Sequence, residues 1–139
     1  MKIFRKDVDY AVRALLELAL AGRGEYLSSS DIAQRQNIPL RYLRRILSKL
    51  ISEGVLAARE GAGGGVCLAR KCADISVLDL TDMFQGGIEL SDCMYRRQPC
   101  ENRDSCPLRR RIMKVQTSLT AELNAITIAD LLDDIKAGK

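Results

Sequence analysis

The glycine-rich run Gly61-Ala62-Gly63-Gly64-Gly65 constrains the fold more than any other part of this sequence. Glycine weakens the interior of helices and strands because its backbone loses the most freedom on folding, so this run predicts a tight turn. The flanking segments, residues 55–60 and 66–69, are short and suit extended strands. The pattern therefore predicts a two-stranded hairpin centred on the glycines.

Three amphipathic helices are predicted before this hairpin. Apolar residues recur at helical spacing over residues 7–21 and 39–53, and a cluster of serines offers N-caps for a shorter helix over 28–36. Asn37 suits the left-handed turn between the second and third helices. Three helices followed by a hairpin are typical of a winged helix-turn-helix, so residues 1–75 are predicted to form a DNA-binding domain of this kind.

The predicted third helix carries a basic face, as a recognition helix would. Its solvent-facing side chains are expected to be Arg41, Tyr42, Arg44, Arg45 and Lys49. The planar guanidinium of arginine can bond twice to guanine edges or phosphates, so Arg41, Arg44 and Arg45 are the candidates for reading bases. The alternative is an ordinary solvated helix face.

Charge and the hairpin extend the predicted contact with double-stranded DNA. Residues 1–75 contain 13 Lys and Arg against 8 Asp and Glu, whereas residues 76–139 contain 9 against 10. A basic excess in the first half is expected of a nucleic-acid-binding module. The remaining residues predicted to contact DNA are Ser29, Arg59, Gly63 and Gly64.

Residues 76–139 are predicted to contain helices over 77–84, 107–124 and 128–135, with a loop over 88–106. Apolar residues of the long helix alternate three and four positions apart, which indicates a near-heptad seam and a C-terminal dimerisation helix. This seam consists of Leu108, Ile112, Val115, Leu119 and Leu123. The predicted fold is therefore mainly α with a small β-hairpin.

Three cysteines, Cys93, Cys100 and Cys106, lie within fourteen residues of the predicted loop. Thiolates are good ligands for iron–sulfur clusters and for zinc, and the missing C-x2-C pairs favour a cluster over zinc. The alternatives are unconnected loop thiols or a disulfide-type redox switch. Cys67 is expected to be a small core residue, and Cys72 has no assigned role.

Other classes of protein are disfavoured by what the sequence lacks. It has no histidine, P-loop, G-x-S-x-G motif or redox C-x2-C, so an enzyme is not expected. The first ten residues lack the apolar core of a signal peptide, and no apolar run approaches the ~20 residues of a membrane span. We therefore expect a cytoplasmic protein without a membrane partner.

These segments together resemble the IscR/NsrR family of bacterial Rrf-type transcriptional regulators. The resemblance runs nearly from end to end. Apart from the three-cysteine loop, it rests on the segments DYAVRALLELA, LSSSDIAQRQNIPLRYLRRILSKLISEGVL, GAGGG, ISVLDL and TIADLL.

The resemblance implies a homodimer that binds a pseudo-palindromic operator and carries a [2Fe-2S] or [4Fe-4S] cluster on Cys93, Cys100 and Cys106. The His ligand of one branch is excluded because this chain has no histidine. Asp9 matches the aspartate that, in the other branch, reaches the cluster of the second subunit; alternatively, it only complements the helix dipole. The expected function is regulation of transcription by redox state, nitric oxide or iron–sulfur status. The alternative is a cluster-free regulator that responds through cysteine oxidation or a protein partner.

Overall fold

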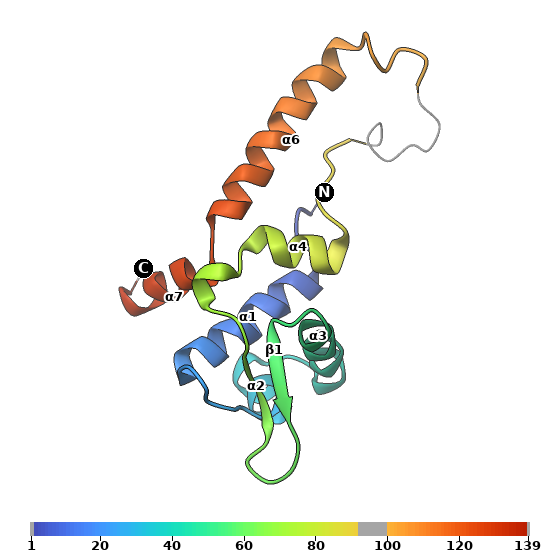
Figure 1. The fold of residues 1–139 in the computed structure, drawn as a ribbon. Coiled ribbons are helices and arrows are strands. Elements are labelled where there is room, and N and C mark those ends of the chain that lie inside the picture. Colours follow the sequence, from blue (N-terminus) through green and yellow to red (C-terminus); the bar gives the residue numbers. More distant parts are fainter. Residues whose placement is uncertain (1, 92–99, 139) are drawn as a thin grey trace.

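The computed structural model describes residues 2–91 and 100–138 and has the predicted, mainly helical architecture with one antiparallel hairpin (Figure 1). The elements in chain order are α1 (Lys6–Ala21), α2 (Ser29–Gln36), α3 (Leu40–Ser52), β1 (Leu56–Arg59), β2 (Gly65–Leu68), the short 3-10 helix η1 (Cys72–Asp74), α4 (Val77–Gln85), α6 (Pro107–Ala125) and α7 (Ile128–Lys136). The bounds of the predicted helices are confirmed to within about two residues. Within the described ranges, no helix is long and apolar enough to cross a bilayer.

Helix α1 lies at the centre of the molecule and packs against α2, α3, α4 and α7. Its apolar stripe is fully buried at two small and two large side chains, Ala11, Ala14, Leu15 and Leu18. Burying one leucine contributes about 1.5–3 kcal/mol. The helix-turn-helix with its hairpin and the C-terminal helices therefore share one hydrophobic core.

The helix-turn-helix is set by local signals at each end of α2. The Ser28 hydroxyl accepts a hydrogen bond of 3.0 Å from the backbone N–H of Asp31, so Ser28 is the N-cap. Asn37 ends the helix in the predicted left-handed conformation, with φ of 51°. Ile38 follows and is only 4 % exposed, so it fills the angle between α2 and α3 as a core residue.

The hairpin is fastened to the helical body by a third backbone segment. Strands β1 and β2 pair antiparallel, with Leu56 opposite Leu68 and Arg59 opposite Gly65. Leu27, just before α2, forms an isolated bridge with Val66 through two hydrogen bonds of 3.0 and 2.9 Å. A Cβ atom at Gly65 would lie 2.1 Å from the Leu27 carbonyl oxygen, so only glycine allows this approach.

Helices α4 and α7 begin with the same motif. In α4, the Ser76 hydroxyl accepts from the Asp79 backbone N–H, and the Asp79 carboxylate accepts from the Ser76 N–H. Thr127 and Asp130 repeat this reciprocal pair at the start of α7. Each such capping box satisfies two backbone donors that a helix end otherwise leaves free.

The two capping boxes are joined to each other by backbone hydrogen bonds. The Val77 N–H donates to the Ile126 carbonyl and the Ile128 N–H donates to the Ile75 carbonyl, both at 2.9 Å. The chain therefore returns, after α6, to the point at which α4 began.

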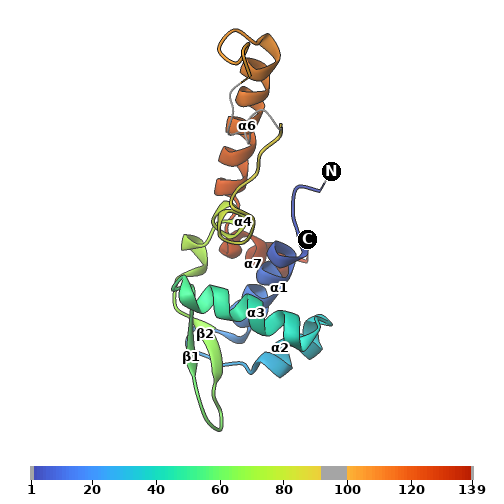
Figure 2. The same ribbon diagram turned by 90° about the vertical axis from the view of Figure 1, so that its right-hand side faces the viewer.

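Helix α6 projects away from the rest of the molecule as a rod (Figures 1 and 2). Near its base, Leu123 is buried against Val77 and Ile88, and Leu119 is half-buried there. The side-chain amide of Gln116 also accepts a 3.1 Å hydrogen bond from the Leu90 N–H. Farther out along α6, Leu108, Met113 and Val115 are exposed.

Candidate nucleic-acid interface and cysteine segment

Helix α3 separates its two faces clearly. Its inner face buries Leu43, Ile46, Leu47 and Leu50. On its outer face, the exposed cations are Arg41, Arg44, Arg45 and Lys49. Among the described residues, Arg41 and Arg44 form no ion pair. These two guanidinium groups are therefore available to an anionic partner.

Tyr42 differs from the expectation that it lies on the solvent face. It is half-buried, because its hydroxyl donates a short hydrogen bond to the Asp7 carboxylate and its ring packs edge-on against Tyr10, with centroids 5.3 Å apart. The bond to Asp7 raises the pKa of Tyr42 above its ordinary value. Tyr42 therefore ties α3 to the start of α1 rather than projecting outward.

Arg45 belongs to the same arrangement. Its guanidinium lies 4.6 Å from the centroid of the Tyr42 ring and 4.0 Å from an Asp7 carboxylate oxygen. The side chain nevertheless remains 70 % exposed. Such a stacked, loosely paired arginine is oriented without being sequestered from a partner.

Asp9 continues this arrangement along α1. Its carboxylate forms a 2.9 Å ion pair with Arg13, and the Arg13 guanidinium lies 5.7 Å from the centroid of the Tyr10 ring. A connected series of contacts therefore runs from Asp9 through Arg13 and Tyr10 to Tyr42. It links the predicted fourth cluster ligand to the predicted recognition helix.

The hairpin uses one of its predicted DNA contacts internally. The Arg59 guanidinium lies 4.1 Å from the centroid of the Tyr26 ring and donates a 2.8 Å hydrogen bond to the Gly63 carbonyl. Arg59 thus braces the turn of the hairpin. Gly63 is exposed at the tip, whereas Gly64 is half-buried against the Arg59 carbonyl.

Ser29 and Lys49 lie at the ends of the predicted surface. Ser29 is the first residue of α2 and is half-buried beside the capping residue Ser28. Lys49 is exposed in the last turn of α3 and pairs with Glu53 at 3.1 Å. An exposed pair of this kind contributes little to stability, so Lys49 can exchange Glu53 for a phosphate at low cost.

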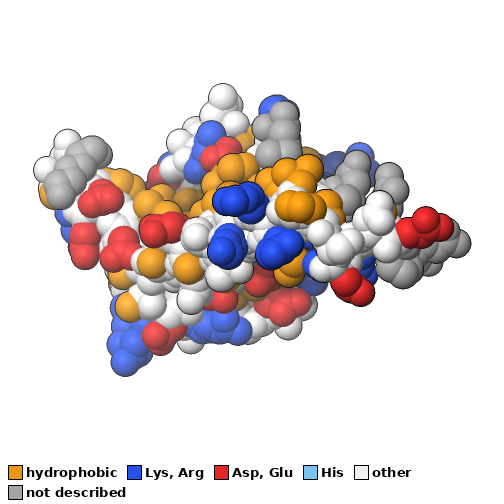
Figure 3. Space-filling model, turned by 90° about the horizontal axis from the view of Figure 1, so that it is seen from above, with side chains coloured by type: hydrophobic (Ala, Val, Ile, Leu, Met, Phe, Trp, Pro, Cys, Tyr) orange, Lys and Arg blue, Asp and Glu red, His pale blue; other side chains and the backbone are white. Residues whose placement is uncertain are grey.

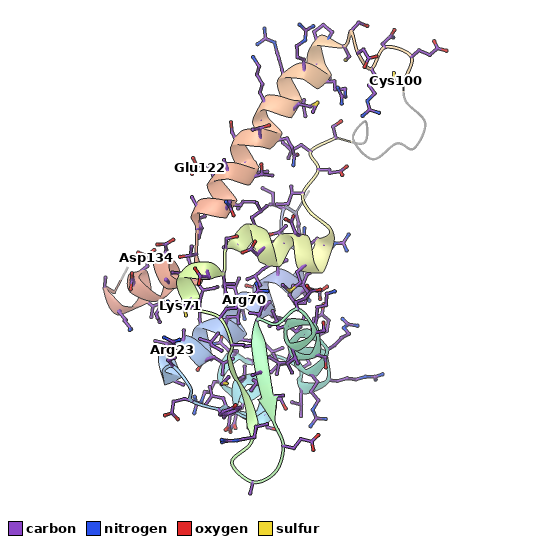
Figure 4. The ribbon with its side chains drawn as sticks, viewed as in Figure 1. Arg23, Arg70, Lys71, Cys100, Glu122 and Asp134 are labelled. Carbon is purple, nitrogen blue, oxygen red and sulfur yellow. The ribbon has the colours of Figure 1, made fainter. Side chains whose placement is uncertain are left out.

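Two of the three clustered cysteines lie at the outer end of α6. Cys100 is exposed (Figure 4), and Cys106 is half-buried immediately before Pro107, the first residue of that helix. Cys93 lies outside the described residues. Within the described ranges, no three His, Cys, Asp or Glu side chains converge as a metal site. The donor set of thiolates without histidine nevertheless fits an iron–sulfur cluster.

Asp9 is not close to these cysteines within one chain. Helix α1 lies in the body of the molecule, whereas residues 100–106 lie beyond the far end of α6 in both ribbon views (Figures 1 and 2). A shared site would therefore require Asp9 from a second copy of the chain.

The segment that leads to the cysteines is attached to the middle of α6. The Gln116 side chain accepts from the Leu90 N–H at 3.1 Å and donates a short hydrogen bond to the Ile88 carbonyl. Cys106 is the N-cap residue of the same helix. Both ends of the segment 91–106 are thus fixed to α6.

The outer half of α6 exposes apolar side chains that a lone helix would not favour in water. Leu108 is 68 % exposed, Val115 54 % and Met113 41 %. Figure 3, which looks down on the molecule from above, shows hydrophobic side chains on either side of a group of Lys and Arg side chains. Of the predicted seam, Ile112 and Leu119 are half-buried and Leu123 belongs to a core within the chain, so Leu108 and Val115 are its accessible part.

Several residues of the candidate sites were not found from the sequence. Asp7 and Tyr26 each act through a partner distant in the sequence, Tyr42 and Arg59 respectively. Gln116 is one polar residue among many on a long helix. The signal that could have indicated Asp7 is its position in the first turn of α1, the helix that packs against α3.

Comparisons with known proteins agree with this geometry. The model of the Rrf2 family, described as an iron-dependent transcriptional regulator, matches residues 4–134. The transcriptional repressor NsrR of Streptomyces coelicolor is 33% identical over 128 residues, covering 91% of this chain and 86% of the relative. The transcriptional regulator IscR of Vibrio atlanticus is 30% identical over 125 residues, covering 90% and 72%.

Solved structures share the fold. The structure of T. potens IscR superposes with a TM-score of 0.79 at 27% identity, covering 100% of this chain and 91% of the other. The structure of CymR, the global cysteine regulator of B. subtilis, superposes with a TM-score of 0.77 at 24% identity, covering 96% and 98%. The predicted winged-helix fold is thus confirmed.

Proposed function

Because the chain belongs to the Rrf2 family and is a DNA-binding transcriptional regulator, we propose that an iron–sulfur cluster on Cys93, Cys100 and Cys106 controls its affinity for DNA. One observation carries the proposal: exposed and half-buried thiols stand at the outer end of α6, on a segment anchored to that helix at both ends. The visible and electron paramagnetic resonance spectra of oxygen-free protein, with its iron and sulfide content, test it.

The residues of this chain divide the work of such a site. Three thiolates hold the group, and Asp9 from a second copy supplies the fourth ligand. The cluster, when bound, supplies a centre sensitive to oxidation and to nitric oxide. Asp9 forms an ion pair with Arg13 in this structure. If Asp9 bound the cluster of a second copy instead, the Arg13 guanidinium would lose this partner.

The contacts between α1 and α3 support a route from Asp9 to DNA. Arg13 lies against Tyr10, Tyr10 against Tyr42, and Tyr42 beneath Arg45. A change in the position of Arg13 therefore acts on residues that orient the recognition helix. In this proposal, DNA affinity and the state of the cysteine segment are coupled through that series, and the coupling is reciprocal.

Replacing Arg44 by alanine should weaken specific DNA binding by about 1–3 kcal/mol, the usual range for a lost contact to a base. Arg44 is exposed on α3 and free of ion pairs among the described residues, so the substitution should not disturb the fold. A binding site is first selected from randomised duplexes with the wild-type protein. Fluorescence anisotropy with that duplex then measures the affinity at several salt concentrations.

The matched control is Arg111→Ala, which removes an exposed arginine from α6. It should bind the selected duplex as the wild type does. If Arg44→Ala and Arg45→Ala both bind like this control, the basic face of α3 does not read the DNA.

We also propose that the chain forms a homodimer through α6, as a pseudo-palindromic operator would require. Support comes from the exposed apolar side chains of its outer half, which a partner helix would cover. Val115→Asp should weaken the dimer by roughly 10- to 100-fold, because it buries a charge in that interface. Sedimentation equilibrium measures the change.

Val115 is a better test than Leu119, which also packs within the chain. Circular dichroism of Val115→Asp should match the wild type, so that a loss of fold is separated from a loss of association. A wild-type protein that remains monomeric at high concentration would contradict the proposed dimer, as would an unaltered dimer in the variant.

Exposure of Cys100 favours a second candidate, a regulator of the same fold that responds through thiol oxidation without a cluster. Peptide mass spectrometry after mild oxidation distinguishes the two. A reversible disulfide among Cys93, Cys100 and Cys106, in protein that binds no iron under oxygen-free conditions, would favour the second candidate.

A further inference from the structure

A cavity of about 360 Å³ opens where the end of α1, the end of β2 and helix α7 meet. Its apolar wall includes Ala19, Leu68 and Leu132, one from each of these elements. This volume lies within the range of small-molecule sites, which are concave and mostly apolar with a few polar groups. The cavity is remote from the cysteine segment at the other end of the molecule (Figure 4).

Three cations line the same cavity: Arg23, Arg70 and Lys71. No Asp or Glu is among the lining residues, and none of the three cations forms an ion pair within the described part of the chain. Arg70 is held in place because it donates a 2.8 Å hydrogen bond to the Glu53 carbonyl. Arg70 also borders a second surface hollow together with Glu53, Asp79 and Asp82, so carboxylates lie near its charge. Arg23 and Lys71 have no acidic neighbour among the residues that line the cavity, and an anion would relieve the repulsion between them.

Cys72 and the end of α7 complete the environment. Cys72 is half-buried in the lining, and burial raises the pKa of its thiol, so it stays neutral and forms part of the apolar wall. The charge of Lys136 acts on this thiol from α7 and opposes the shift. A fourth cation therefore lies near the cavity.

We propose that this cavity binds a small organic anion with an apolar body and one carboxylate, sulfonate or phosphate group. The apolar part would lie against Leu68 and Leu132, and the anionic group would meet the cations at the opening. Arginine suits this role because its fork can bond twice to an oxyanion. The bound molecule would contact α1, the hairpin and α7 at once.

This surface is separate from the face proposed to contact DNA. Figure 4 places Arg23 and Lys71 on the side where α7 packs, whereas α3 lies on the other side of the hairpin. The occupant expected here is therefore a small molecule rather than duplex DNA.

The dye 8-anilinonaphthalene-1-sulfonate has the required apolar body and single anionic group, and N-phenyl-1-naphthylamine is its neutral counterpart. We expect the double variant Arg23→Gln/Lys71→Gln to bind the sulfonate roughly 10-fold more weakly than the wild type, the equivalent of about 1.4 kcal/mol. Its affinity for the neutral amine should not change. Fluorescence titration of the folded, full-length protein measures both affinities.

The control Arg111→Gln/Lys114→Gln removes one arginine and one lysine from the exposed face of α6 and should keep wild-type affinity for the sulfonate. The sulfonate should also slow alkylation of Cys72 by iodoacetamide without protecting the exposed Cys100. Equal loss in the two double variants would overturn the proposal, as would wild-type affinity in the first. Displacement of the sulfonate by duplex DNA would also overturn it, because the cations would then belong to the DNA surface.

Discussion

Cys100→Ala protein, purified without oxygen, should contain essentially no bound iron, whereas the wild type should contain iron and sulfide in stoichiometric amounts. Cys100 is exposed, so alanine removes little buried surface and the effect on the fold should be small. The loss of the cluster should be complete, because the Cys100 thiolate forms a bond to iron that the methyl group of alanine cannot form. Colorimetric iron and sulfide assays and the visible spectrum measure the loss.

Cys72→Ala is the matched control, because Cys72 begins η1 next to Lys71, which Figure 4 places in the body of the molecule, far from Cys100. It should retain the iron content and the spectrum of the wild type. Equal iron in Cys100→Ala and Cys72→Ala would show that Cys100 is not a ligand. A wild-type protein that stays colourless after reconstitution with iron and sulfide would refute the cluster itself.

Gly65→Ala should destabilise the protein by roughly 2–4 kcal/mol, because it combines two costs. The residue has a φ of 140°, which L-residues rarely adopt, and its new Cβ would lie 2.1 Å from the Leu27 carbonyl oxygen. Relief requires the Leu27–Val66 bridge to open, which would release the hairpin from α2. Chemical denaturation followed by circular dichroism measures the change in the free energy of unfolding.

Gly63→Ala separates the two costs. Gly63 also has a positive φ, of 73°, but no atom lies within 4 Å of the position that its Cβ would take. We expect it to lose only the conformational part, about 1 kcal/mol. If the two variants were equally stable, the clash of the new Cβ at residue 65 with Leu27 would not contribute to the loss of stability.

Much of the fold follows from signals that are local in the sequence. Helical periodicity predicted α1, α3 and α6, N-capping residues predicted α2, α4 and α7, and Gly61 to Gly65 located the turn of the hairpin. The left-handed Asn37 and the buried Cys67 were predicted from residue type alone. Each of these features depends on neighbours in the chain.

The remaining features depend on contacts between distant segments. The position of Tyr42 in α3 predicts a solvent-facing side chain, but its contacts with Asp7 and Tyr10 of α1 turn it inward. Leu123 continues a regular seam, yet Val77 and Ile88 cover it. The residues that line the cationic cavity come from α1, β2, the segment after β2 and α7, so no single stretch of sequence predicts it.

The joined starts of α4 and α7 make the root of α6 a pivot. Hydrogen bonds from Val77 to Ile126 and from Ile128 to Ile75 hold the chain at this point. With 19 residues, α6 is a lever arm about 28 Å long. Moving its cysteine-bearing tip by about 3 Å would turn the root by only roughly 6°, given the rise of 1.5 Å per residue. A displacement at the cysteine-bearing end of α6 would thus become a small rotation at the point where α4 and α7 begin.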